Sequence, residues 1–249
     1  NFFIFIIIRK KVMNKTLITG FVSKYALGNS VESVKWVVQD RLLSTAFKTP
    51  DKTCRGTVSV RNIDLPDGEI GIFNTEQLMR MLSILDTDII IDIRKQKGVP
   101  VALDVSDTNT SIGYVLAQLD IIPNPGKLKM VPTFVCNISI DDMFSSRFIK
   151  SAGALPDCSY FTITRDAMNT QLTFGYSDIN SNTVAYDVNS TATQDVEAIH
   201  FSSTIMRDIL TANKGTPGQI EISPVGLMRV TFKTSEYDAE YYLVNKQID

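Results

Sequence analysis

The sequence has little of the side-chain chemistry on which most enzymes depend. Among its 249 residues there is a single histidine, His200. A catalytic centre or metal site built from several histidines is therefore excluded. The sequence also lacks the phosphate-binding loop G-x-x-x-x-G-K-[ST], the nucleophile motif G-x-S-x-G and the zinc motif H-E-x-x-H. We therefore expect a protein that is not an enzyme, has no catalytic or metal-ligating residues and uses no cofactor.

Cysteine and net charge are equally uninformative about a ligand. The three cysteines, Cys54, Cys136 and Cys158, fit no metal-binding spacing, and an odd number argues against a disulfide framework. The 25 basic and 27 acidic residues leave a net charge of −2. This balance gives no overall sign of nucleic-acid binding, so any such function requires a local basic surface.

No apolar run is long enough to span a bilayer. The most apolar run, Phe2–Ile8 in "NFFIFIIIRKKVM", has seven residues, and its basic residues follow it, whereas a signal peptide carries them before its apolar core. We expect residues 1–12 to be a non-native or disordered leader before Met13, and we expect no membrane partner. The alternatives for this segment are an extra strand or a membrane-touching arm.

The sequence that is present repeats itself. "LMR" at 78–80 returns as "IMR" at 205–207, and the same offset of 127 places Tyr114 on Tyr241 and Leu116 on Leu243. An offset of 126 places Leu17 on Met143 and Lys24 on Lys150. One register held over about 100 residues indicates a duplicated domain. We predict domains at 13–118 and 135–249, joined by a proline-rich connector at 119–134.

Each half is predicted to contain two helices and several strands. The helices are expected in 14–28, 74–85, 139–153 and 202–215, with Asn14, Asn74, Ser139 and a serine at 202 as N-caps and Gly28, Gly153 and Gly215 as stops. The remaining segments are rich in Val, Ile, Thr, Tyr and Phe between polar turns. This alternation favours an α+β fold in which two helices per domain pack on antiparallel sheets.

The four predicted helices carry basic residues away from their apolar faces. In 74–85, Leu78, Leu82 and Leu85 share one face, and Arg80 points the other way. The basic residues in the four helices exceed the acidic ones, and most of the acidic ones lie in first turns. A polyanion could bind such a face, although exposed cations near helix ends are also common without a ligand. The candidate DNA-binding residues are Lys15, Lys24, Arg80, Arg147, Lys150, Arg207 and Lys214.

The duplicated arrangement of helices and strands, together with two segments of the sequence, resembles the sliding clamps, the processivity factors of DNA polymerases. "IGIFNTEQLMRMLSIL" is most similar to phage and viral clamps, and "DAEYYLVNK" is similar to the final strand of clamps generally. The resemblance implies the two-domain type, which closes as a homotrimeric ring around duplex DNA. It implies a DNA polymerase and a clamp-loader ATPase as partners, and action at replication forks in the cytoplasm of a bacterial host cell.

Clamps of this kind dock short partner peptides beside the connector and the C-terminal tail. The matching positions here are Leu119, Ile121, Ile122, Met130, Val244 and Ile248. Two other functions stay open on the residues alone. One is a β-rich, duplicated structural protein of a virion, and the other is a viral processivity factor with the clamp fold that works as a monomer.

Overall fold

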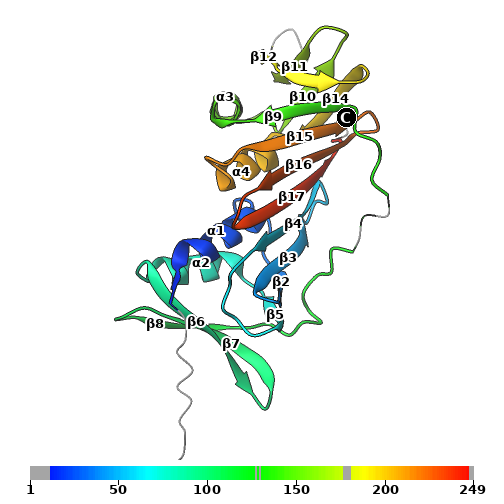
Figure 1. Ribbon diagram of the computed structural model, residues 1–249. Coiled ribbons are helices and arrows are strands. Elements are labelled where there is room, and N and C mark those ends of the chain that lie inside the picture. Colours follow the sequence, from blue (N-terminus) through cyan, green and yellow to red (C-terminus); the bar gives the residue numbers. More distant parts are fainter. Residues whose placement is uncertain (1–11, 127, 129, 176–180, 247–249) are drawn as a thin grey trace, which may run out of the picture.

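The computed structural model describes residues 12–126, 128, 130–175 and 181–246. Within these residues the chain forms four helices, two in each half (Figure 1). They are α1 (Lys15–Ala26), α2 (Thr75–Ser83), α3 (Asp142–Ala154) and α4 (Ser203–Ala212). Among the described residues, none of these helices has the length and apolar character that crossing a bilayer requires.

The duplication seen in the sequence reappears in the pattern of burial. In α1 the buried positions include Ile18, Val22 and Ala26, and their partners at an offset of 126 are Phe144, Phe148 and Ala152, which are buried in α3. Likewise Leu78 and Leu82 of α2 correspond to the buried Ile205 and Ile209 of α4 at an offset of 127. The two halves therefore repeat both their helices and the faces that these helices bury.

Strands make up most of the remainder and alternate between buried and exposed positions. The first half contains β1 (Met13–Asn14), β2 (Val34–Gln39), β3 (Leu42–Lys48), β4 (Cys54–Val60), β5 (Gly68–Ile72), β6 (Asp88–Gln96), β7 (Val99–Ser106) and β8 (Ser111–Val115). The second contains β9 (Cys136–Ile140), β10 (Tyr160–Arg165), β11 (Thr170–Phe174), β12 (Val184–Val188), β13 (Ser190–Ala192), β14 (Val196–Ser202), β15 (Gly218–Ser223), β16 (Leu227–Lys233) and β17 (Tyr237–Val244).

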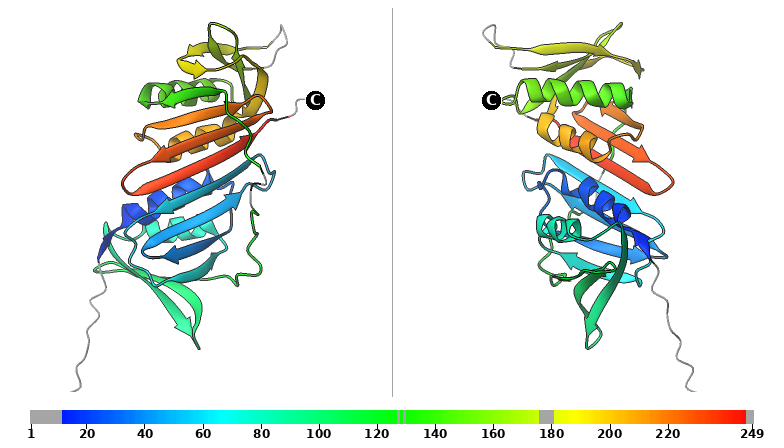
Figure 2. Two further views of the ribbon diagram at one scale, coloured as in Figure 1. Left: turned by 45° about the vertical axis from the view of Figure 1, so that its right-hand side comes forward. Right: turned by 90° about the vertical axis from the view of Figure 1, so that its left-hand side faces the viewer.

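One nine-stranded sheet joins the two halves, in the order β13-β9-β15-β16-β17-β4-β3-β2-β5. The halves meet where β17 pairs antiparallel with β4, with Tyr241 opposite Gly56. Two four-stranded sheets, β1-β6-β7-β8 and β12-β11-β10-β14, lie at the two ends of the molecule. All four helices cover the same face of the long sheet, and the connector between β8 and β9 runs over the other side (Figure 2).

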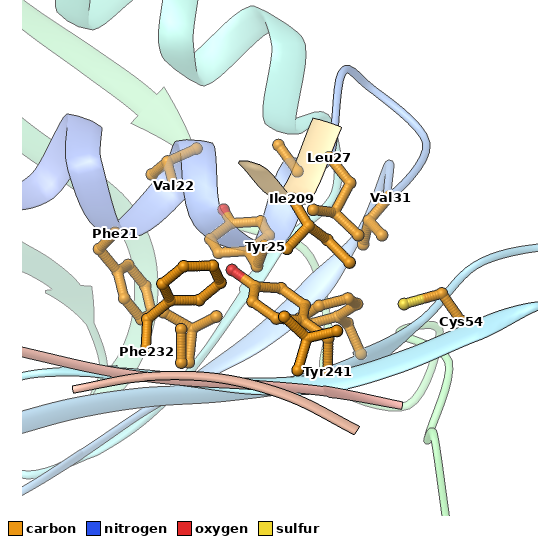
Figure 3. Close-up of a cluster of buried hydrophobic side chains, with 14 of the residues drawn as sticks. Phe21, Val22, Tyr25, Leu27, Val31, Cys54, Ile209, Phe232 and Tyr241 are labelled. Atoms are coloured by element: carbon orange, nitrogen blue, oxygen red, sulfur yellow. The ribbon is translucent and has the colours of Figure 1, made fainter. Parts of the chain in front are cut away.

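The core between helices and sheet is continuous across the junction of the halves. Figure 3 shows Tyr25 of α1 packed among Ile209 of α4 and Phe232 and Tyr241 of the second half. The Tyr241 hydroxyl donates to the Lys24 carbonyl oxygen at 2.9 Å and accepts from Asn213 Nδ2 at 3.1 Å. Burial of these aromatic side chains, at about 25 cal/mol per Å² of apolar surface, stabilises the junction of the two repeats together with the pairing of β17 and β4.

The caps of the first, second and fourth helices were predicted correctly, because Asn14, Asn74 and Ser202 each accept a backbone N–H bond from the first turn. The third helix was predicted wrongly at both ends. Ser139 lies in β9, the N-cap is Asp141, and Gly153 lies inside a helix that continues to Ala154. Serine and aspartate are both good caps, and pairing of 136–140 with β15 decides between them.

Candidate nucleic-acid interface

The helix layer presents its solvent-facing side as one surface. Each helix buries its apolar face against the sheets, which leaves polar side chains on the opposite face. In the right-hand view of Figure 2 the four helices lie side by side in front of the sheet, in the order α3, α4, α1 and α2. We call the solvent-facing side of these helices the helical face.

Four of the seven predicted basic residues are exposed on or beside this face. Arg80, Arg147 and Lys150 project from helices, and Lys214 follows the end of α4. The side chain of Arg80 is 76% exposed and forms an ion pair with Glu76 one turn earlier. The Arg147 guanidinium lies 5.4 Å from the centre of the Tyr186 ring. Exposed ion pairs contribute little to stability, so Arg80 is available to a polyanion that competes with Glu76.

Arg207 and Lys15 are half-buried and have partners within the chain. Arg207 lies 3.5 Å from a carboxylate oxygen of Asp208, whose pKa is raised by burial. The Lys15 ammonium donates to the Leu85 carbonyl oxygen, at the C-terminal end of α2. A cation at that position offsets the negative end of the helix dipole. Both residues border the helical face, and both contribute positive charge to it.

The interpretation of Lys24 as a DNA contact is wrong. Its side chain is buried, with 9% of the residue exposed, and its ammonium donates to the Ala212 carbonyl oxygen at 2.9 Å. The same ammonium lies 4.8 Å from the centre of the Tyr237 ring. Burial lowers the pKa of Lys24. Because the second half of the chain covers α1 on this side, the lysine joins the two halves and does not reach solvent.

The predicted peptide-binding residues do not converge on one pocket. Ile122 is buried, 4% exposed, and packs against Gly71 where the connector leaves the sheet. Ile121 is 57% exposed and lines a groove of about 500 Å³ with Phe73, Met81 and Tyr114.

The other predicted positions lie away from that groove. Leu119 lines a neighbouring groove beside β5 and β7. Met130 is 82% exposed in the connector, and Val244, at the end of β17, donates its N–H to the Thr53 carbonyl oxygen. Ile248 falls outside the described residues. These placements divide the predicted pocket between the beginning of the connector and the C-terminal end of the chain.

A small cavity under the connector was missed at the sequence level. It is lined by Leu128 and Val131 from the connector and by Arg55 and Tyr242 from the sheet. Arg55 also donates to the carbonyl oxygens of Pro125 and Gly126, which holds the connector against β4. The alternation of β4 and β17 could have placed Arg55 and Tyr242 on one face, but only the path of the connector places Leu128 and Val131 above them.

Nothing in the described part of the chain suggests metal or nucleophile chemistry. No group of three or more His, Cys, Asp or Glu side chains is arranged to hold a metal there. Cys54 and Cys136 are buried, and burial raises the pKa of each thiol, which keeps it unreactive. The His200 Nδ1 atom is hydrogen-bonded to Thr162 Oγ1 at 2.8 Å.

Comparison with solved structures identifies the fold. Over 96% of this chain and 98% of the other, the structure is similar to A. fulgidus PCNA bound to the C-terminal region of FEN-1, with a TM-score of 0.73 and 14% identity. Proliferating cellular nuclear antigen from Entamoeba histolytica matches over 94% and 96% of the two chains, also with a TM-score of 0.73 and 14% identity.

The chain has the sliding-clamp fold. This confirms the predicted α+β architecture of a duplicated clamp domain with two helices on antiparallel sheets. The sequence itself matches no protein-family model and no curated protein. The similarity to these solved structures therefore lies in the fold, with 14% of residues identical.

Proposed function

We propose that this protein is a sliding clamp, which closes as a ring of three copies around duplex DNA and tethers a DNA polymerase to it. The observation that carries the proposal is the helical face, a single layer of helices with exposed cations on a continuous sheet. The sliding-clamp fold supports the same function. A polymerase held at high effective concentration by the ring rebinds its template instead of diffusing away.

The DNA contacts in this proposal come from Arg80, Arg147, Arg207 and Lys214, with Lys15 at the border of the face. Their charges meet phosphate groups, which carry no sequence information. Such contacts are screened by salt and exchange easily, so the duplex can slide through the ring. Retention then depends on the closed ring and not on the strength of any single contact.

Ring closure is suggested by the junction that already exists inside the chain. There, β17 pairs with β4. The repeat equivalents of these strands are β8 and β12, and each is the edge strand of an end sheet. Each copy thus offers one edge of each kind, at opposite ends of the molecule. Pairing β8 of one copy with β12 of the next produces a head-to-tail interface, which closes into a ring if the rotation allows it.

The internal junction also predicts the register of this pairing. In the chain, Ala239 lies opposite Val58 and Asp238 lies opposite Ser59. The repeat offsets convert these pairs into pairs between copies: 127 is subtracted from each β17 residue and 126 is added to each β4 residue. Ile112 should then lie opposite Val184 of the next copy, and Ser111 opposite Ala185 of the next copy. Directly opposed residues in an antiparallel pair have Cα atoms about 4.5–5.5 Å apart, which is within reach of a disulfide.

A double variant, Ser111→Cys with Ala185→Cys, tests the ring. Both positions are exposed and the three native cysteines are buried, so oxidation should join only neighbouring copies. The expected product on a non-reducing gel is a covalent species of three chains and nothing larger. The control, Ser111→Cys with Asp187→Cys, moves one partner by two residues, beyond about 7 Å, and should not cross-link. Cross-linking of the control alone, or an open-ended ladder, would contradict the proposed register and closure.

Encirclement is tested by retention on DNA. Protein loaded by a clamp-loader ATPase should stay on a circular plasmid and leave a linearised one. Arg147→Glu with Arg207→Glu should weaken loading and polymerase stimulation, whereas Lys233→Glu, an equal charge change per residue on the sheet side, should not. Equal retention on both plasmids would rule out a ring. A chain that stays monomeric in light scattering yet stimulates a polymerase would instead be a monomeric processivity factor.

The polymerase and other partners are proposed to dock short peptides at the connector, using the groove around Ile121 or the cavity under Leu128 and Val131. The A. fulgidus protein was solved with the C-terminal region of FEN-1 bound to it, which supports peptide docking by this fold. A phage or viral origin, with action at replication forks in the cytoplasm of a bacterial host, remains part of this proposal.

A further inference from the structure

Lys24 and Lys150 occupy equivalent positions in the two repeats but have opposite environments. Lys24 is buried where the second half of the chain covers α1, and it caps the end of α4 through the Ala212 carbonyl oxygen. Lys150 lies 126 positions later on α3, is exposed, and has no ion-pair partner among the described residues. Because Lys150 occupies the position of Lys24 in its repeat, we expect its ammonium to make the same kind of contact with the end of a helix. That helix would belong to another molecule.

The whole row of α3 around Lys150 shows the same contrast. On α1, Leu17 and Gly20 face Tyr237, whose hydroxyl donates to the Leu17 carbonyl oxygen at 2.9 Å. Their equivalents on α3, at an offset of 126, are Met143 and Ser146, and both are exposed. Met143 is 66% exposed, whereas its counterpart Leu17 is partly buried against the core. Met143 lines a cavity together with Tyr186 and Val188 of β12, the edge strand proposed to meet the next copy.

The same comparison of the two repeats locates the group that would accept the Lys150 ammonium. Ala212, whose carbonyl oxygen binds Lys24, corresponds to Leu85 at the C-terminal end of α2. The carbonyl oxygen of Leu85 already accepts from Lys15 and has a second lone pair. Two carboxylates surround this helix end, Asp86 and Asp107, linked by a hydrogen bond of 2.7 Å from the Asp86 N–H to Asp107. In the second half the corresponding positions are the neutral Asn213 and Thr234.

The Asp107 carboxylate is held in its charged form. It accepts from the backbone N–H groups of Asp86, Asn109 and Thr110, and the first two of these bonds lower its pKa the most. The negative end of the α2 dipole adds to the same field. Among the described residues, the only basic group that an observed bond brings to this end is Lys15. A cation arriving from another molecule therefore finds an excess of negative charge.

We propose that Lys150 is a subunit-junction residue, whose ammonium binds the C-terminal end of α2 of the next copy, beside Asp86 and Asp107. The inference rests on the ring proposed above and assigns Lys150 to its closure, not to DNA. At the internal junction the Tyr237 ring supports the lysine, and its equivalent is Thr110. In the proposed contact the two carboxylates take the place of that ring.

Charge reversal and rescue test this contact. The trimer dissociation constant of the wild-type chain is measured first, by analytical ultracentrifugation in the absence of DNA. Lys150→Glu should raise it by about tenfold or more, because it removes an attraction and places like charges together. Asp86→Lys should do the same, and the double variant should recover most of the affinity. Lys233→Glu is the matched control, with an equal charge change on the sheet side and no expected effect.

The outcomes separate this inference from the ring itself. A wild-type chain that is monomeric at all concentrations overturns both. A trimeric wild type with a Lys150→Glu variant of unchanged dissociation constant overturns the junction role and leaves the ring intact. Loss of assembly without rescue by Asp86→Lys overturns the assigned acceptor. Lys150 is exposed, so circular dichroism of each variant should match the wild type and exclude unfolding as the cause.

Discussion

Replacing Lys24 by alanine should destabilise the folded chain and not merely its binding of DNA. The ammonium makes a charged hydrogen bond to the end of α4, for which mutational series give about 1.5–3 kcal/mol. The favourable position at a helix C-terminus adds about 0.3–1 kcal/mol, and the nearby Tyr237 ring about 0.5–2 kcal/mol. The cost of burying the charge, which also lowers the pKa of Lys24, offsets part of this sum.

A net loss of about 2–4 kcal/mol is therefore expected for Lys24→Ala. The fluorescence of Trp36, the only tryptophan, can follow this unfolding. Trp36 is fully buried in β2, and its Nε1–H donates to the hydroxyl of Tyr25, the neighbour of Lys24 on α1. In urea, with a slope of about 1–3 kcal/mol/M, the unfolding midpoint should fall by about 1 M or more. All chains must be compared at one protein concentration, because assembly also stabilises the folded state.

Two further variants make the experiment decisive. Lys24→Met keeps the apolar stem and should recover part of the loss. Lys214→Ala removes an exposed lysine after α4 and should stay within about 0.5 kcal/mol of the wild type. If Lys24→Ala unfolds at the wild-type midpoint but loses retention on DNA, the reasoning is refuted and the lysine acts on the nucleic acid after all.

Three more outcomes are expected. Ile122→Ala should cost about 2–5 kcal/mol in urea unfolding, because the side chain is buried, whereas Ile121→Ala should leave stability within about 0.5 kcal/mol and weaken binding of a partner peptide in a titration. Gly56→Ala should destabilise by about 1–3 kcal/mol, since an added Cβ would lie 2.8 Å from the Glu240 carbonyl oxygen across the junction. Burial lowers the pKa of His200 below 6.5 in the folded chain, so the unfolded chain takes up a proton first as the pH falls. The contribution of neutral His200 to thermal stability should be fully present above pH 6.5 and be lost below it. Thermal stability should therefore fall less steeply with pH in His200→Gln.

Much of the local structure follows from short-range patterns. The strand at 34–39 alternates buried and exposed positions as its sequence does, with Trp36 inward. Asn14 and Asn74 begin helices because their side chains satisfy free N–H groups in the first turn. Strands β3 and β14 depend on the neighbouring strands with which they pair.

The site was predicted less well, for a reason that Lys24 and Arg80 illustrate. Arg80 points away from the apolar stripe of its helix, whereas Lys24 flanks the face formed by Leu17 and Phe21. Nothing within α1 shows that this flank is covered. A second packed surface covers α1 on the side of Lys24, where Tyr237 arrives from more than 200 positions away. The corresponding side of α2 is open. The exposure of a helical side chain therefore depends on how the two halves pack together. Helical periodicity indicates only which face of a helix packs on the sheet.

The order of residues alone predicts the duplicated unit, its two helices per half and basic residues on the outer faces of these helices. Folding in three dimensions decides which lysine is buried, how β17 meets β4, where the connector lies and which strands are left at the edges. The first set depends on interactions within a few turns or along one strand. The second depends on contacts between segments far apart in the chain, and no local period encodes them.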